Sequence, residues 1–240
     1  MEPVLDARRH ALLEAMGVDV WVRRDAVAVA DVSVAPVADA VPARAPASSG
    51  DAATALAALA REVAACTACA LAETRTQTVF GAGAAEARCL VIGEAPGAEE
   101  DRRGEPFVGR AGQLLNAMLA AIGLARDSVY IANILKCRPP NNRDPQPAEV
   151  VACSSFLRRQ IALVAPRVIL AVGRVAAQNL LGVDTPIGRM RGQDYVYADS
   201  GIPVVVTYHP AYLLRSPGEK RKAWVDLQRA KRVLDAAGDA

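Results

Sequence analysis

Short, continuously apolar runs alternate with amphipathic stretches along the chain after about residue 50. The apolar runs end in glycine or polar residues, which is typical of strands buried on both faces of a parallel sheet. They cover residues 88–93, 128–135, 167–173 and 202–208. The amphipathic stretches have helical spacing and cover residues 54–65, 111–123, 146–165, 174–182 and 219–235. This alternation predicts an α/β fold in which helices cover both faces of a parallel sheet.

The first 50 residues have a different pattern. Residues 4–16 have the spacing of a short amphipathic helix, and residues 18–25 are compatible with a strand. Residues 26–50 are rich in alanine, valine, proline and serine, which is the composition of a semi-extended linker. We therefore predict a largely disordered N-terminal arm (1–50) and one folded domain (51–240). Whether the arm docks an unknown protein partner is left open.

The amino-acid composition is that of a globular protein and argues against a membrane-spanning one. Of the 240 residues, 52% are hydrophobic and 22% are charged, as in ordinary globular proteins. No segment reaches the roughly 18 apolar residues of a membrane helix, and the charged N-terminus does not resemble a signal peptide. We therefore expect a cytosolic protein with no membrane partner.

Basic residues gather near the carboxyl end, although the net charge is only +2. Seven lysines and arginines between residues 209 and 232 stand against Glu219 and Asp226. They are Arg215, Lys220, Arg221, Lys222, Arg229, Lys231 and Arg232. Such a run can meet the phosphates of a nucleic acid, and a solvated helix face has the same composition.

Polar and aromatic side chains follow the predicted strands, at the edge where ligands bind in α/β proteins. The loop after the first strand carries Glu94, Glu100 and Phe107. Asn133 lies in the second strand, and His209 follows the fourth. This combination suits a nucleobase, whose ring can stack on an aromatic side chain and whose edge an amide can read. The glycine-rich loop matches no phosphate-binding motif, and its acidic run would repel phosphate.

Four of the five cysteines are candidate metal ligands. Cys89 lies inside the first predicted strand and is most simply a core thiol. Cys66 and Cys69 form a C-x-x-C pair, whereas Cys137 and Cys153 lie apart downstream. Structural zinc usually takes two close pairs, while an iron–sulfur cluster accepts dispersed cysteines. The spacing alone leaves iron–sulfur, zinc and unmetallated thiols open.

Four motifs in this order resemble the family 4 uracil-DNA glycosylases, the iron–sulfur type found in bacteria and archaea. They are "GEAPGAEED", "PFVGRAGQLL", "NILKCRPPNNRDP" and "HPAYLLR", and the resemblance covers about residues 60–235. It implies a three-layer α/β/α sandwich around a four-stranded parallel sheet. It also implies excision of uracil from DNA in base excision repair, in the bacterial cytosol or nucleoid. The implied cofactor is a [4Fe–4S] cluster on Cys66, Cys69, Cys137 and Cys153, and we expect a monomer.

The resemblance assigns a base-recognition role to each strand-end loop. Phe107 would stack on the flipped uracil. Asn133 would pair with the N3–H and O4 edge, which rejects cytosine because its amino group reverses one donor. Glu100 would help to close the pocket through water. The side that faces the base and the sugar would be lined by Gly93, Glu94 and Ala95.

The candidate catalytic residues are His209, Glu94 and Asn142. His209, as a neutral imidazole, would donate to uracil O2 as negative charge gathers there, and one such donor is worth roughly 3 kcal/mol. Asn142 is a candidate for positioning water. Ala95 stands where the best-known uracil-DNA glycosylases have a water-activating aspartate, which family 4 members generally lack. The group that positions the water is therefore left open.

The segment "HPAYLLR" would hold the DNA. Tyr212, Leu213 and Leu214 would press into the duplex where the base departed, and Arg215 would hold phosphates. One leucine can instead pack on the core, and the sequence does not say which. The substrate would be double-stranded DNA, with single-stranded DNA left open. Three basic residues flank the third cysteine and suggest that the cluster orders a DNA-contacting loop: Lys136, Arg138 and Arg143.

Other readings of the same residues make different predictions. A sister enzyme that bonds covalently to the abasic sugar needs a histidine in an inserted basic loop, which "KCRPPNNRDP" lacks. A preference for hypoxanthine stays open. A metal-dependent DNA-binding module would bind without releasing a base, and it leaves Phe107, Asn133 and His209 without a role. A phosphotransferase would need a lysine and metal-binding carboxylates that the glycine-rich loop does not have.

Overall fold

The computed structural model describes residues 49–236. The predicted helix at 4–16, the possible strand at 18–25 and nearly all of the linker lie outside the described residues. At its carboxyl end the predicted linker is two residues too long, because helix α2 (Ser49–Ala64) already begins at Ser49. None of the described helices is long and apolar enough to cross a membrane.

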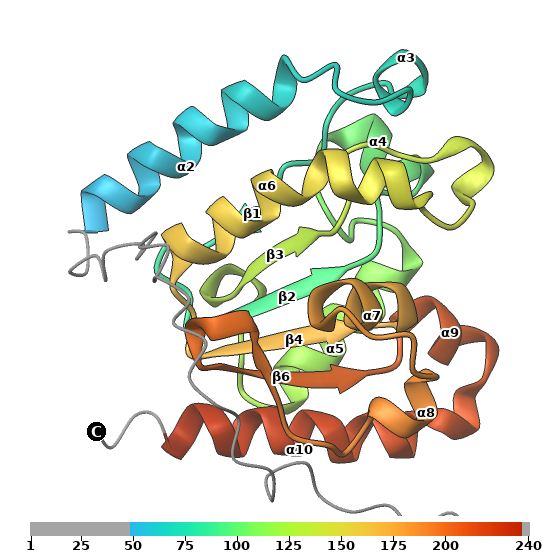
Figure 1. Ribbon diagram of the computed structural model, residues 1–240. Helices are drawn as coiled ribbons and strands as arrows, with labels where there is room; N and C mark the ends of the chain where they lie inside the picture. The colour runs from blue at the N-terminus through green and yellow to red at the C-terminus, as the bar shows by residue number, and fades with distance from the viewer. Residues whose placement is uncertain (1–48, 237–240) are drawn as a thin grey trace, which may run out of the picture. The chain divides into compact units, whose positions relative to one another are not determined.

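A mixed sheet of six strands forms the centre of the domain, in the order β1-β3-β2-β4-β6-β5 (Figure 1). The four inner strands are parallel, as predicted. They are β2 (Cys89–Gly93), β3 (Tyr130–Asn133), β4 (Val168–Val172) and β6 (Ile202–Thr207). The short antiparallel edges β1 (Ala82–Gly83) and β5 (Tyr195–Tyr197) were not predicted, because two or three residues are too few to show a periodic pattern.

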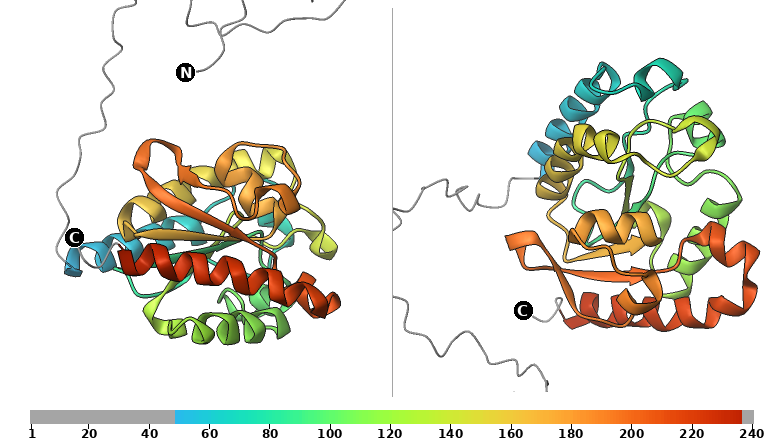
Figure 2. Two further views of the ribbon diagram at one scale, coloured as in Figure 1. Left: turned by 90° about the horizontal axis from the view of Figure 1, so that it is seen from below. Right: turned by 45° about the vertical axis from the view of Figure 1, so that its right-hand side comes forward.

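Long helices cover both faces of the sheet, which confirms the three-layer α/β/α architecture (Figures 1 and 2). On one face α6 (Pro147–Val164) and α7 (Arg174–Leu181) pack against the strands, and α2 packs against α6. On the other face lie α5 (Arg110–Ala121) and α10 (Lys220–Ala236). Shorter helical segments lie in the connections: α3 (Leu71–Thr74), α4 (Ala98–Arg103), η2 (Arg126–Ser128), η3 (Pro140–Asn142), α8 (Ile187–Met190), η4 (Ala198–Ser200), α9 (Pro210–Arg215) and η5 (Pro217–Glu219).

Local sequence signals fix where the long helices begin and end. Helix α6 starts with Pro147, and Gln146 and Glu149 form a reciprocal capping box there. Helix α7 ends at Gly182, whose left-handed backbone (φ 64°) is the usual glycine C-cap.

Each inner strand alternates its side chains between two apolar clusters. In β2, Leu90 and Ile92 pack with α6 and α7, whereas Cys89 and Val91 pack with α5 and α10. Cys89 is therefore the core thiol that the sequence predicted, and burial raises its pKa to about 12. Because all four inner strands point the same way, their carboxyl ends share one edge of the sheet, with Gly93 paired to Asn133.

Candidate active site and thiol-lined cavity

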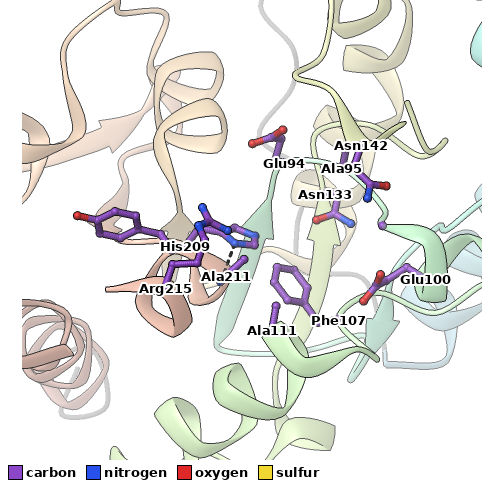
Figure 3. A pocket seen from close by; sticks show the side chains of 12 residues that line it. Glu94, Ala95, Glu100, Phe107, Ala111, Asn133, Asn142, His209, Ala211 and Arg215 are labelled. Carbon is purple, nitrogen blue, oxygen red and sulfur yellow. Dashed lines mark hydrogen bonds between the residues drawn. The ribbon is translucent and has the colours of Figure 1, made fainter. Parts of the chain in front are cut away.

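A pocket of about 430 Å³ lies at the carboxyl edge of the sheet (Figure 3). Its walls come from the loop after β2, the end of β3, the loop after β3, and the turn that joins β6 to α9. It is lined by Glu94, Ala95, Gly97, Glu100, Phe107, Ala111, Asn133, Asn142, His209, Ala211, Tyr212 and Arg215. The predicted convergence of strand-end residues is therefore real.

Phe107 supplies an apolar ring to this pocket from the loop between α4 and α5. It is only 7% exposed, and its ring centroid lies 5.6 Å from that of His209. Its backbone is left-handed (φ 53°), which is strained for a residue with a bulky side chain. Gly112 permits this position, because a Cβ there would lie 1.7 Å from the Phe107 carbonyl oxygen. The loop backbone therefore fixes the position of the Phe107 ring.

Asn133 ends strand β3 and is 2% exposed. Its side-chain Oδ1 is buried and has no hydrogen-bond partner within the described part of the chain. A buried acceptor without a hydrogen bond destabilises a protein by about 1–3 kcal/mol. A ligand that donates a hydrogen bond to this oxygen would therefore bind more tightly by a similar free energy. Gly93 lies beside it in β2, where an added Cβ would come within 2.4 Å of this oxygen. Gly93 is not itself a lining residue, but its lack of a side chain makes room for Asn133 and Phe107.

His209 caps the first turn of α9. Its Nδ1 accepts a hydrogen bond from the Ala211 backbone N–H at 3.1 Å (Figure 3). The pKa of His209 is lowered to about 4, mainly by burial and also by the positive charge of Arg215, against a raising effect of Glu100. The ring is therefore neutral at pH 7, and the hydrogen bond at Nδ1 assigns its single proton to Nε2. This leaves Nε2–H as the available donor.

Glu100 holds the loop that carries the aromatic ring. Its Oε1 accepts hydrogen bonds from the backbone N–H groups of Val108 and Gly109, at 3.0 and 3.1 Å. Glu100 lines the pocket and contacts this loop directly, without an intervening water, while its role in closing the pocket on a base stays a prediction.

Glu94 follows β2 and lines the pocket opposite the aromatic ring (Figure 3). The pKa of Glu94 is raised to about 7, mainly by burial and also by the negative charge of the nearby Asp144, against a lowering effect of Arg174. Arg174 and Asp144 form an ion pair at 2.5 Å, so the two effects partly cancel. A carboxyl group with a pKa near 7 can exchange protons at neutral pH.

Asn142 lies at the pocket rim in η3 and has a left-handed backbone (φ 53°). Its Oδ1 accepts a hydrogen bond from Arg138 Nε at 2.8 Å, which orients the amide. The neighbouring Arg143 turns away to form a bidentate ion pair with the buried Glu149, at 2.6 and 2.9 Å. These contacts link the loop after β3 partly to itself and partly to helix α6, which carries Glu149.

Helix α9 separates the two leucines of "HPAYLLR". Leu213 is 1% exposed and belongs to the core cluster under α5 and α10. This corrects its assignment to the DNA-contacting set, because the helical turn directs it inward. Tyr212 and Leu214 are each 36% exposed on the outer side, and Tyr212 also lines the pocket beside Arg215.

Ion pairs neutralise part of the basic run near the carboxyl end. Lys222 pairs with Glu219 at 2.9 Å, Lys231 pairs with Asp235 at 2.5 Å, and Arg229 pairs with Asp194. No ion pair within residues 49–236 involves the remaining four, which are Arg215, Lys220, Arg221 and Arg232. The cationic surface is thus smaller than the sequence count indicates.

The four predicted ligand cysteines line one cavity, although they come from three separate segments. Cys66 and Cys69 follow α2, Cys137 follows β3, and Cys153 lies in α6. Burial raises the pKa values of Cys137 and Cys153. Among residues 49–236 no three or more histidine, cysteine, aspartate or glutamate side chains form a group that could hold a metal ion.

Nitrogen donors surround these sulfur atoms. Arg75 donates to Cys137 Sγ at 3.1 Å, and the Lys136 backbone N–H donates to Cys153 Sγ at 3.3 Å. The side chain of Lys136 is 1% exposed, lines the same cavity, and donates from Nζ to the Asn133 carbonyl at 2.8 Å. Lys136 is therefore part of the interior beside the cysteines, and its ammonium group is not on the surface of the loop after β3.

The structure brings together most of the predicted pocket residues and adds three small ones. Glu94, Ala95, Glu100, Phe107, Asn133, Asn142 and His209 all line the pocket. Sequence reasoning missed Gly97, Ala111 and Ala211, whose lack of bulk leaves room in the pocket. Glycine and alanine carry no functional group that would identify them as pocket residues in a sequence. Only their position beside the motif residues could have indicated that they line the pocket.

Comparison with known proteins defines the class. Residues 80–228 match the family model for the uracil DNA glycosylase superfamily. The chain is 49% identical to the type-4 uracil-DNA glycosylase of Archaeoglobus fulgidus over 163 residues, which are 65% of this chain and 82% of that protein. It is 43% identical to the type-4 enzyme of Thermotoga maritima over 72% of this chain and 91% of that one. The type-4 enzyme of Sulfurisphaera tokodaii is 42% identical over 72% and 81% of the two chains.

The α/β sheet and the base-sized pocket at its carboxyl edge thus fit the superfamily that the family model defines. Within that superfamily, the chain belongs to the type-4 uracil-DNA glycosylases.

Proposed function

We propose that this protein removes uracil from DNA by hydrolysing the N-glycosidic bond, and so begins base excision repair. Membership of the type-4 family supports the activity. The observation that carries the assignment of residues is the buried, unpaired Oδ1 of Asn133, which faces the same pocket as Phe107 and His209. A planar base with a donor on its edge would satisfy all three groups.

Recognition of uracil follows from the chemistry of Asn133 and Phe107. The Asn133 Oδ1 accepts the uracil N3–H, and its Nδ2 donates to O4. Cytosine has no hydrogen at N3 and carries a donor at position 4, so both contacts would fail. Phe107 stacks on the ring, which is worth about 1–3 kcal/mol for a base on an aromatic side chain. Glu100 keeps the loop closed by holding Val108 and Gly109.

Bond cleavage relies on stabilisation of the departing base. The C1′–N1 bond breaks and its electron pair moves into the uracil ring, where negative charge gathers at O2. The Nε2–H of His209 donates to O2, and removal of one such donor typically lowers kcat about 100- to 1,000-fold. A neutral imidazole suits this role, because it donates without needing to lose its own proton.

Water then adds to C1′ of the oxocarbenium-like sugar and loses a proton. We assign acceptance of that proton to Glu94, whose raised pKa makes it a base near neutral pH. Asn142 lies at the rim and would orient the water through its amide. The product is an abasic site, and no covalent bond to the protein forms.

DNA contacts would come from α9 and its neighbours. Tyr212 and Leu214 are exposed beside the pocket and would fill the space left by the flipped base. Arg215, Lys220 and Arg221, which form no ion pair within the described part of the chain, would hold phosphates. We propose that the protein acts as a monomer on DNA in the cytosol, at the nucleoid. Residues 1–50 remain a candidate docking arm for a protein partner.

The four cysteines would bind a [4Fe–4S] cluster. A cubane has one iron for each cysteine, so its ligands surround a volume, which agrees with four thiols around one cavity. Hydrogen bonds from Arg75 and the Lys136 N–H to the sulfur atoms are of the kind that stabilise such clusters. Once bound, the cluster would cross-link three segments and so order the loop after β3. Full DNA affinity in a folded, cluster-free Cys137→Ala variant would contradict this ordering role.

A cleavage assay tests the proposed activity. Wild type and His209→Ala would be incubated with a labelled duplex that contains one U opposite G, followed by alkali to break abasic sites. A matched duplex with T in place of U is the control. We expect breakage at U alone, reduced about 100-fold or more in the variant. A cluster-loaded wild type that leaves the U strand intact would refute the proposal.

A further inference from the structure

Arg126 makes four hydrogen bonds around the loop that carries Phe107, although it belongs to none of the recognisable motifs. It lies in η2, just before strand β3, 19 residues after the aromatic side chain. One guanidinium nitrogen donates to the carbonyl of Phe107 at 3.3 Å and to Asn116 Oδ1 at 3.0 Å. The other donates to the carbonyl of Pro106 at 2.6 Å and to Glu105 Oε1 at 2.9 Å.

Two of these four bonds are made to the backbone at Pro106 and Phe107, where Phe107 is in a strained conformation. The left-handed conformation of Phe107 (φ 53°) costs of order 1–3 kcal/mol for a residue that is not glycine. Such a conformation persists only where its surroundings hold it in place. On one side of the loop Glu100 accepts from the N–H groups of Val108 and Gly109. On the other side Arg126 donates hydrogen bonds to the carbonyl groups of Pro106 and Phe107.

We propose that Arg126 is a positioning residue for uracil recognition, which acts by holding the Phe107 ring at its stacking distance in the pocket. The proposal rests on the proposed function, in which Phe107 stacks on the base. Arg126 does not line the pocket and does not touch the substrate. A planar guanidinium is suited to the task, because its fixed fork can reach two neighbouring carbonyl oxygens at once.

The ion pair with Glu105 is the least important of the four contacts. Its carboxylate is half exposed, and ion pairs at such positions contribute little. Glu105→Gln therefore serves as the matched control, because it removes the charge of one partner and leaves both backbone contacts in place. We expect kcat/KM within about twofold of wild type for this variant.

The test is a double-mutant cycle between Arg126→Met and Phe107→Ala. The readouts are kcat and KM on a uracil-containing duplex, the inhibition constant of free uracil, and the unfolding temperature. We expect Arg126→Met to lower kcat/KM roughly 10- to 100-fold, as misplacement of a recognition group does, and to weaken uracil inhibition. Phe107→Ala should have an effect of roughly tenfold or more. In the Phe107→Ala background, Arg126→Met should cost only about twofold more, because the ring through which it acts is gone.

A purely structural role for Arg126 predicts a different result. Its effect would then be the same in both backgrounds, and that additivity would overturn the proposal, as would wild-type kinetics of Arg126→Met. If Arg126→Met does not fold, Arg126→Lys and Asn116→Ala take its place in the cycle, since each keeps some of the hydrogen bonds between residue 126 and the loop. Wild-type kinetics of Phe107→Ala would instead refute the stacking role in the proposed function, and the inference with it.

Discussion

Gly93→Ala should abolish most activity while leaving the domain folded. Gly93 ends β2 directly behind the two residues proposed to recognise uracil. A methyl group at this position would lie 2.4 Å from Asn133 Oδ1 and 2.7 and 2.8 Å from two carbon atoms of the Phe107 ring. All three distances are shorter than van der Waals contact, so these atoms must move. Each is the far end of a side chain, which makes movement feasible without unfolding the strand.

The expected losses of stability and of transition-state stabilisation are similar in free energy, but only the second one is large in its effect. Overpacking of this kind typically destabilises a protein by about 1–3 kcal/mol, against a total stability of about 5–15 kcal/mol, so the domain survives. A recognition group displaced by about 1 Å can lose about 100-fold in rate. That loss corresponds to about 2.7 kcal/mol of transition-state stabilisation. In Gly93→Ala both the Asn133 amide and the Phe107 ring are displaced. We therefore expect kcat/KM to fall by about 100-fold or more.

The assay compares Gly93→Ala with Gly188→Ala. Gly188 lies in α8, and a Cβ there meets nothing within 4 Å, so this control carries the same chemical change without a clash. Single-turnover excision from a U·G duplex gives the rate, and thermal unfolding gives the stability. Gly188→Ala should match wild type in both. A folded Gly93→Ala protein with kcat/KM within about twofold of wild type would refute the assignment of this pocket to uracil.

Three further predictions test other parts of the site. Because the pKa of Glu94 is raised to about 7 and its ionised form is the proposed base, the rate should fall as the pH drops below about 7. This limb should disappear in Glu94→Gln, and its persistence there would contradict the role. His209, with a pKa of about 4, should add no limb near pH 6.5. Leu214→Ala should slow uracil excision from duplex DNA more than from single-stranded DNA, because the exposed Leu214 is proposed to fill the space left by the flipped base. Leu213→Ala should instead lower the free energy of unfolding by about 2–5 kcal/mol, measured by urea unfolding, because Leu213 is buried in the core. With the proposed cluster, Cys153→Ser should lose bound iron and unfold at a lower temperature, because one of the links between α6 and the loop after β3 is removed. Unchanged iron content would oppose the assignment of Cys153 as a ligand.

The order of elements could be predicted from the sequence because it depends on local periodicity. The four buried strands and the helices between them appear as apolar runs and amphipathic stretches, and each forms where its own residues favour it. The convergence of Phe107, Asn133 and His209 followed from the same reasoning, since parallel strands bring their carboxyl ends, and the loops that follow them, to one edge.

The edge strands and the direction of individual side chains were decided only by tertiary packing. β1 and β5 exist because β3 and β6 offer them a partner, and their few residues carry no pattern of their own. Leu213 and Leu214 are chemically identical neighbours, and only the docking of α9 on the core turns one inward. Lys136 is basic in the sequence and buried beside the cysteines in the structure.

The amino-acid sequence by itself thus determined the order of helices and strands, the four candidate ligand thiols, and the aromatic, amide and imidazole groups of the pocket. The tertiary structure decided which groups can reach one another. Arg126 holds the strained loop at Phe107, and the Asn133 Oδ1 is buried without a hydrogen-bond partner among residues 49–236, through contacts between segments distant in the chain. Local patterns report the preferences of neighbouring residues. They do not report distances across the fold, because those depend on how the elements pack.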